Sequence, residues 1–155
     1  MTIDTAKPSE ATHTLILTPG LWLAEGQWYD ECDRGLPVQG LTRIDHRRHG
    51  WEMFSELKVV DSARMVRNHY LIRPATDRNP VMQWKSENGR LGSLTGTFTV
   101  VDEVIVSLFG NRRSGIRGSE CLRRVSEDHY LDHGVLFDRE AKISSWRIEL
   151  RRQAG

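Results

Sequence analysis

Cysteine is scarce in this chain, with only Cys32 and Cys121 among 155 residues. Neither belongs to a CxxC or Cys/His pattern with zinc spacing, so we expect no metal site and no cofactor. Whether the two thiols pair is left open, and two reduced thiols in a cytoplasmic protein are the expectation. Long apolar runs are also lacking, which excludes a membrane-spanning helix. Residues 1–18 lack a basic start followed by an apolar stretch, so no signal peptide is expected.

An excess of charge of either sign is absent as well, because the formal net charge is only +1. Such a balance argues against nucleic acid or an anionic membrane as a partner. No stretch of twelve or more residues carries the apolar stripe of an amphipathic helix, and no repeat is found. We expect a flexible tail over residues 1–18, followed by a single domain over residues 19–155.

From Gly20 onward, apolar and polar residues alternate with a period of two, and turn residues recur about every ten positions. This pattern predicts strands near 21–29, 37–46, 50–60, 64–73, 81–86, 91–101, 103–110, 115–125, 128–137 and 141–151. Consecutive hairpins without a long crossover favour an all-β fold: an antiparallel up-and-down β-barrel of about 8–10 strands with little helix. Closure of the sheet would remove its exposed edges.

Turn positions predict strand registers, and registers predict which side chains share the inner face. Turns at Asp61–Ser62 and Asp102–Glu103 place two sets of apolar residues on that face. Turns at Ser126–Glu127 and Arg139–Glu140 bring Glu120 opposite His133, both pointing inward. The turn at Asn88–Gly89 leaves two registers open, one with Gln83 inside and one with Met82 and Trp84 inside. We favour the second, because Leu94 and Phe98 need apolar neighbours.

The tripeptide Gly20–Leu21–Trp22 at the start of the first predicted strand resembles a motif of the calycin superfamily, the lipocalins and fatty-acid-binding proteins. The resemblance covers about residues 19–152. It implies that Trp22 seals one end of a barrel and that a basic residue of the last strand, Arg147 or Arg151, packs over it. The link from Asp30 to Gly35 is too short for the helical lid of fatty-acid-binding proteins, and no C-terminal helix or signal peptide is expected.

A barrel of about ten strands is wider than side chains fill, which predicts an internal pocket. Its ligand-binding lining is predicted to be Trp51, Met53, Trp84, Phe98, Ser107, Phe109 and Trp146. A carboxylate beside an imidazole could hold a proton donor or acceptor near neutral pH, so the predicted catalytic residues are His133, Glu120, Tyr70 and Asn68.

Three hypotheses follow for the function. The first is binding of a small hydrophobic or aromatic ligand inside the barrel. The alternative is a cofactor-independent cyclase, isomerase or dehydratase of bacterial natural-product biosynthesis that uses Glu120 and His133 as an acid–base pair. The third is a filled barrel that acts through its surface, with a homodimer left open. A lone His133 could also serve as an axial haem ligand, although no second haem signature supports this.

Overall fold

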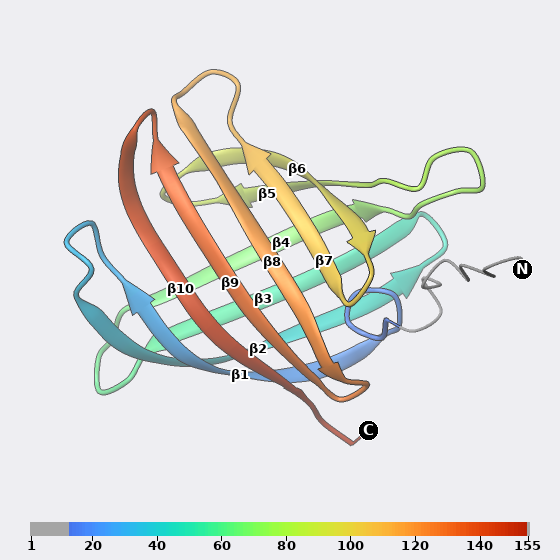
Figure 1. The fold of residues 1–155 in the computed structure, drawn as a ribbon, viewed down its shortest axis with the longest axis horizontal. Coiled ribbons are helices and arrows are strands. Elements are labelled where there is room, and N and C mark those ends of the chain that lie inside the picture. The colour runs from blue at the N-terminus through green and yellow to red at the C-terminus, as the bar shows by residue number, and fades with distance from the viewer. Residues whose placement is uncertain (1–12, 155) are drawn as a thin grey trace, which may run out of the picture.

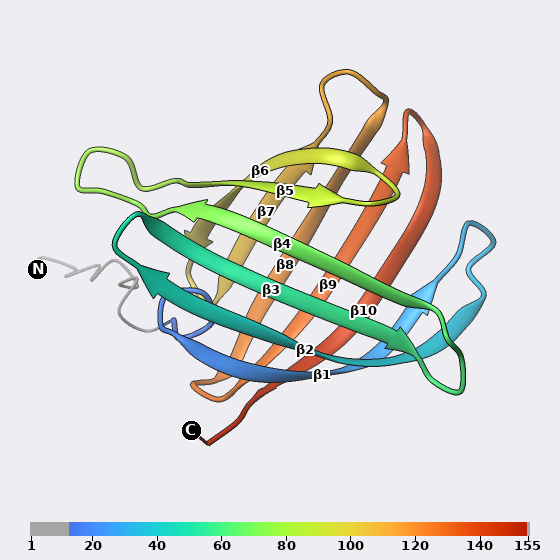
Figure 2. The ribbon, with the colours of Figure 1, turned by 180° about the vertical axis from the view of Figure 1, so that it is seen from behind.

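The computed structural model describes residues 13–154, so most of the predicted tail lies outside the described residues. Ten antiparallel strands close into one barrel in which every strand pairs with its neighbours in sequence and β1 pairs with β10 (Figures 1 and 2). The strands are β1 (Gly20–Tyr29), β2 (Gly35–Arg47), β3 (Gly50–Val59), β4 (Met65–Arg73), β5 (Met82–Asn88), β6 (Gly92–Val101), β7 (Val104–Gly110), β8 (Ile116–Ser126), β9 (His129–Asp138) and β10 (Ala141–Arg152). The predicted up-and-down barrel is therefore confirmed.

The meander gives the barrel two different ends. The β2–β3, β4–β5, β6–β7 and β8–β9 connections lie at one end, together with both ends of the described chain (Figure 1). The β1–β2, β3–β4, β5–β6, β7–β8 and β9–β10 turns lie at the other. We call these the closed end and the open end. Asp33, Asp61 and Asp102 occupy tight turns with positive φ, a conformation that aspartate tolerates better than most residues.

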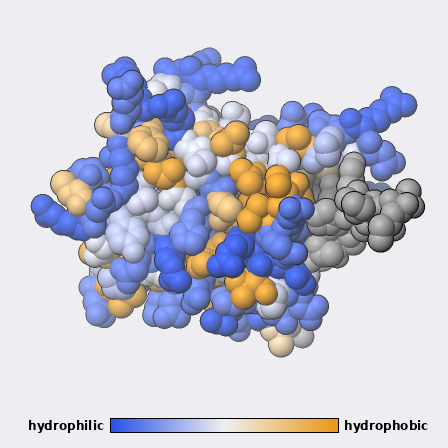
Figure 3. Space-filling model, in the orientation of Figure 1, coloured by the Kyte–Doolittle hydropathy of each residue, from blue (hydrophilic) through white to orange (hydrophobic). Residues whose placement is uncertain are grey.

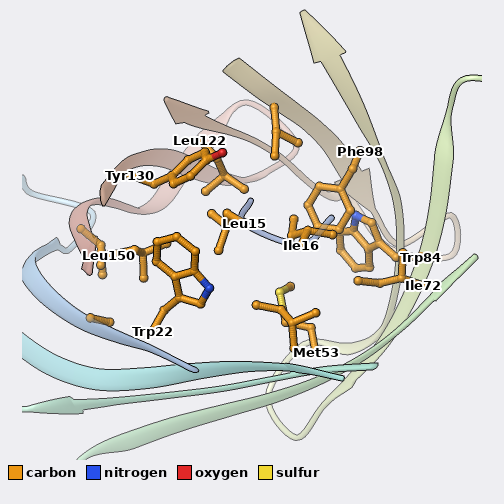
Figure 4. Close-up of a cluster of buried hydrophobic side chains, with 14 of the residues drawn as sticks. Leu15, Ile16, Trp22, Met53, Ile72, Trp84, Phe98, Leu122, Tyr130 and Leu150 are labelled. Atoms are coloured by element: carbon orange, nitrogen blue, oxygen red, sulfur yellow. The ribbon is translucent and has the colours of Figure 1, made fainter. Parts of the chain in front are cut away.

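The closed end is filled by a short N-terminal segment, His13–Pro19, which we call the plug. Leu15 and Ile16 are almost completely buried, and they lie between side chains from opposite walls of the barrel (Figure 4). The surrounding core contains Trp22, Ile44, Ile72, Met82, Phe98, Ile105, Leu122, Tyr130 and Leu150. Six residues assigned to the flexible tail, 13–18, are therefore part of the packed domain.

Hydrogen bonds fix the plug to the barrel. One ring nitrogen of His13 lies 2.8 Å from the Tyr130 hydroxyl and the other lies 2.8 Å from the Asp102 carbonyl oxygen. The Thr14 amide also donates to the Tyr130 hydroxyl, and His46 donates from Nε2 to the Ile16 carbonyl oxygen. Ile16 has a φ of 70°, a strained conformation for a β-branched residue. Packing and these bonds together hold it there.

Trp22 is fully buried at this end, as the calycin resemblance implies, but its basic partner differs from the prediction. Trp22 pairs directly with Arg152, whose guanidinium lies 5.9 Å from the centre of the indole. Arg152 also donates to the Pro19 carbonyl oxygen. Arg147 and Arg151 fall on the alternate, outer face of β10 and are exposed.

Most predicted registers place the expected residues inside. The β3–β4 and β6–β7 pairings agree residue for residue with those predicted, for example Met53 with Tyr70 and Phe98 with Ser107. The β2–β3 and β7–β8 pairings are shifted by two residues from the pairings that turn positions predict. The same side chains therefore stay on the inner face. Met82 and Trp84 are buried, so the favoured register at Asn88–Gly89 is confirmed.

The register around β9 corrects the position of His133. A β-bulge at Val125 on β8 and another at Ile143 on β10 flank this strand. Each bulge inserts one residue, so β9 is one residue out of phase with the predicted hairpins. His133 consequently points outward and is exposed, whereas Asp132 points inward and is buried. The predicted pair of Glu120 and His133 is not formed, and His133 cannot hold a haem inside the barrel.

The outer surface mixes charged and apolar residues. Figure 3 shows apolar side chains gathered on part of the face formed by β7 to β10, with charged groups around them. Leu108 on β7 is 63% exposed. No helix within residues 13–154 is long and apolar enough to cross a membrane.

Candidate ligand-binding site

The open half of the barrel differs from the closed end because its inward-facing side chains keep accessible surface. Trp28, Tyr70, Phe109, Glu120 and Trp146 all point inward by register, yet each is only partly buried. A filled core would bury them, as the plug buries Trp22 and Tyr130. We call the space that these five side chains line the inner recess.

Two carboxyl groups face each other in the wall of the recess. Glu120 on β8 and Asp132 on β9 lie close enough for each to alter the pKa of the other, and the Trp146 indole lies beside Asp132. Asp132 is 9% exposed. Its Oδ1 is buried and accepts no hydrogen bond from any described residue. No salt bridge within residues 13–154 reaches either carboxyl group.

This environment favours a protonated pair. Burial raises the pKa of Glu120, because a charge taken out of water loses its hydration. Burial also raises the pKa of Asp132 well above its usual range, and the negative charge of Glu120 raises it further. Two adjacent carboxylates without a cation cannot both be charged at low cost. The pair therefore keeps a shared proton to higher pH than two separate, solvated carboxyl groups would.

Tyr70 on β4 stands near the carboxyl pair within the recess. Burial raises the pKa of its hydroxyl, with further contributions from the negative charges of Glu120 and Asp132. Ser55 on β3, the register partner of Asn68, lies close enough to lower that pKa slightly. The Tyr70 ring packs edge-on against Trp84, with ring centres 5.0 Å apart. The phenol is therefore neutral and held in place.

Glycines in the strands let the aromatic rings lie flat against the barrel wall. A Cβ atom on Gly134 would lie 2.1 Å from the Trp146 ring, and one on Gly118 would lie 2.5 Å from Phe109. A Cβ atom on Gly96 would lie 2.5 Å from the Trp84 ring. Glycine inside a strand often marks such a close approach. The glycines therefore let these rings pack closely against the neighbouring strands.

The other predicted site residues are divided between the closed half and the open half of the barrel interior. Met53 and Phe98 belong to the buried core, and Trp51 stacks on His46 near the closed end at 3.8 Å between ring centres. Ser107 is buried and accepts a hydrogen bond from Trp84 Nε1 at 3.2 Å. Asn68 accepts a hydrogen bond from Asn88 at 2.7 Å, toward the open end.

Sequence reasoning missed Asp132, Trp28 and the plug. A register that points His133 inward points Asp132 outward, and the two bulges beside β9 reverse both directions. The apolar run Leu15–Ile16–Leu17 was a usable signal for the plug, because it interrupts an otherwise polar N-terminus. No cluster of three or more metal-ligating side chains occurs in the part of the chain that the structure describes.

Two shallow hollows are lined by both inward-facing and outward-facing residues of the barrel wall. One, of about 360 Å³, is lined by Leu108, Phe109, Arg117, Gly118, Ser119, Val135 and Phe137. The other, of about 340 Å³, is lined by His49, Gly50, Trp51, Leu71, Ile72, Arg73, Gln83, Trp84 and Lys85. Neither hollow contains a buried polar atom without a partner. The chemistry of this molecule is therefore concentrated inside the barrel.

No protein-family model and no curated protein sequence matches the chain significantly. Among solved structures, the chain is similar to the S-type phycobiliprotein lyase CPES from Guillardia theta, with a TM-score of 0.67. The two chains are 10% identical, and the match covers 88% of each. This similarity shows that the two proteins share a fold, while no sequence family is identified.

Proposed function

We propose that this barrel binds a small, flat aromatic molecule in the inner recess, reached from the open end. The observation that carries the proposal is the contrast between the two halves of the interior. The plug and its neighbours bury the closed end, whereas the aromatic side chains of the recess keep accessible surface. Concave sites lined by aromatic rings with a few polar groups are typical of small-molecule pockets.

The arrangement of the rings supports a flat ligand. Trp146 and Phe109 lie against glycines in neighbouring strands, so their faces can contact a planar molecule between them and the opposite wall. Aromatic pairs contribute about 0.5–1.5 kcal/mol beyond the burial of their area. The similar structure is that of a phycobiliprotein lyase, so a bilin belongs among the molecules tested.

Tryptophan emission tests this proposal. Titration with two-ring aromatic compounds, a bilin and haem should give saturable quenching for at least one flat aromatic compound. Trp146→Phe should remove much of the change, because Trp146 lines the recess. The matched control is Trp51→Phe, which alters a tryptophan stacked on His46 near the closed end and should leave the affinity unchanged. A response that depends on Trp51 but not on Trp146 would contradict the proposal.

The carboxyl pair favours a second candidate, a proton-transfer enzyme without a cofactor. Burial raises the pKa of both Glu120 and Asp132, and a carboxyl group with a raised pKa can serve as a general acid or base. This version replaces the one built on His133, whose side chain lies outside the barrel. Recovery of the ligand from the complex separates the two candidates, since a binding protein returns it unchanged and an enzyme converts it.

A further inference from the structure

Two buried polar atoms in the interior of the barrel have no hydrogen-bond partner among the described residues, and they carry an inference that rests on the proposed function. Asp132 Oδ1 is buried without a partner. Ser86 on β5, the register partner of Tyr70, is 3% exposed, and its Oγ is also without a partner. Buried polar atoms in folded proteins are rarely left unpaired. Two such atoms on different strands of the same interior indicate that something else supplies their hydrogen bonds.

Two donors near the recess already have partners inside the barrel. The indole N–H of Trp84 donates to Ser107. Asn88 donates to Asn68. A ligand that brought only acceptors would therefore leave Oδ1 of Asp132 unpaired. A ligand that brings an N–H group would satisfy it.

The distribution of charged side chains also favours a ligand that carries an N–H group. The basic side chains of the open end lie at its rim. Arg64 stands over the Trp28 ring at 5.9 Å, and Lys142 forms an ion pair with Asp33. No positive group contributes to the pKa of Glu120 or Asp132. The groups that act on the pair are Tyr70, Trp146 and Cys121, and none of them carries a positive charge. A cation would thus find two uncompensated carboxyl groups, and an anion would find no counter-charge.

We infer that the inner recess selects a flat aromatic base, with its ring N–H or amino group donating to Asp132 Oδ1 and its positive charge beside Glu120. A ligand that arrives neutral takes the proton from the pair: the O–H bond of Asp132 breaks and an N–H bond forms on the ligand. A ligand that arrives protonated displaces that proton to solvent. In both cases the bound state holds two carboxylates and one cation.

A matched pair of probes tests the inference. 4-Aminoquinoline is cationic in neutral solution, whereas 1-naphthylamine has the same shape and amino group but no basic ring nitrogen. The native protein should bind 4-aminoquinoline at least about tenfold more tightly, because charge-assisted hydrogen bonds are stronger than neutral ones. 1-Naphthoate, an anion of similar size, should bind most weakly of the three. Tryptophan emission serves as the readout, with correction for absorption by the probes.

The variant Glu120→Gln/Asp132→Asn removes the charge and keeps the shape of the pair. Its affinities for 4-aminoquinoline and 1-naphthylamine should lie within about threefold of each other. Its affinity for 1-naphthylamine should stay near that of the native protein. Asp77→Asn, an exposed loop substitution of the same chemistry, should keep the native preference. A thermal melt of each variant verifies that it is folded.

The outcomes separate the inference from the proposed function. Equal affinity of the native protein for both probes would overturn the inference and leave the aromatic recess in place. A preference for 4-aminoquinoline that survives in Glu120→Gln/Asp132→Asn would also overturn it, because the cation would then be held elsewhere. Absence of any saturable response to all three probes would contradict the proposed function itself.

Discussion

Replacing Ile16 with aspartate should lower the free energy of unfolding by about 3–5 kcal/mol. The side chain is 0% exposed and lies in the plug, against the core of the closed end. The substitution removes a buried aliphatic side chain and puts a carboxylate among apolar neighbours. Aspartate accepts the positive φ of this position more readily than isoleucine does, which offsets only a small part of the loss. Urea unfolding followed by far-UV circular dichroism measures the change.

Leu108→Asp is the matched control for that substitution. Leu108 is 63% exposed on the outer face of β7, so the same change of chemistry there should cost less than about 1 kcal/mol. If Ile16→Asp is no more destabilising than Leu108→Asp, the plug is not part of the packed domain. The closed end would then be open in solution, and the contrast between the two halves of the barrel would be lost.

Replacing Asp132 with asparagine should stabilise the protein in neutral and alkaline solution, by about 1–3 kcal/mol. Burial and the charge of Glu120 raise the pKa of Asp132 well above its usual range. The folded state therefore binds a proton that the unfolded state releases between the ordinary carboxyl pKa of about 4 and the raised value. Asparagine keeps the shape of the side chain and needs no proton, so it removes this linkage.

The sign of the pH dependence follows from the same shift. In the native protein, the stability contributed by the protonated carboxyl is fully present below about pH 4, and it is lost as pH rises through the raised pKa. Stability of the native protein should thus fall with rising pH across this window, and the curve for Asp132→Asn should be flatter. Near pH 4 the two proteins should be close in stability. Urea unfolding at a series of pH values measures both curves.

Asp77→Asn is the control for this experiment, since Asp77 is exposed in the β4–β5 loop. Its stability should follow the native curve at every pH. A loss of stability in Asp132→Asn at pH 8 would mean that the carboxylate of Asp132 is stabilised in the folded protein. The carboxyl pair would then not share a proton, and the account of its electrostatics would fail.

The alternation of residues was enough to predict the architecture, because each strand of a meander pairs with its neighbours through a short turn. The turn at Asp61–Ser62 set the β3–β4 register residue for residue. Errors of two residues, as between β2 and β3, left the inner face unchanged, since side chains repeat with a period of two. Only a register shift by an odd number of residues exchanges the inner and outer faces of a strand.

The candidate site depends on such odd shifts. The bulges at Val125 and Ile143 are single-residue insertions without a glycine or proline to mark them, so alternation alone could not reveal them. Glu120 was correctly placed inside, but its partner was taken to be His133 instead of Asp132. The calycin resemblance located Trp22 correctly, and the structure supplied Arg152 as its cover. The plug depends on contacts more than eighty residues apart in sequence, which local patterns do not encode.

A crystal structure of the protein grown with 4-aminoquinoline tests the central claim most directly. The account predicts that the ring system lies in the inner recess between the Trp146 and Tyr70 walls, with an N–H group within hydrogen-bond distance of Asp132 Oδ1. The compound bound in either shallow hollow, with side chains and ordered water filling the recess, would contradict it.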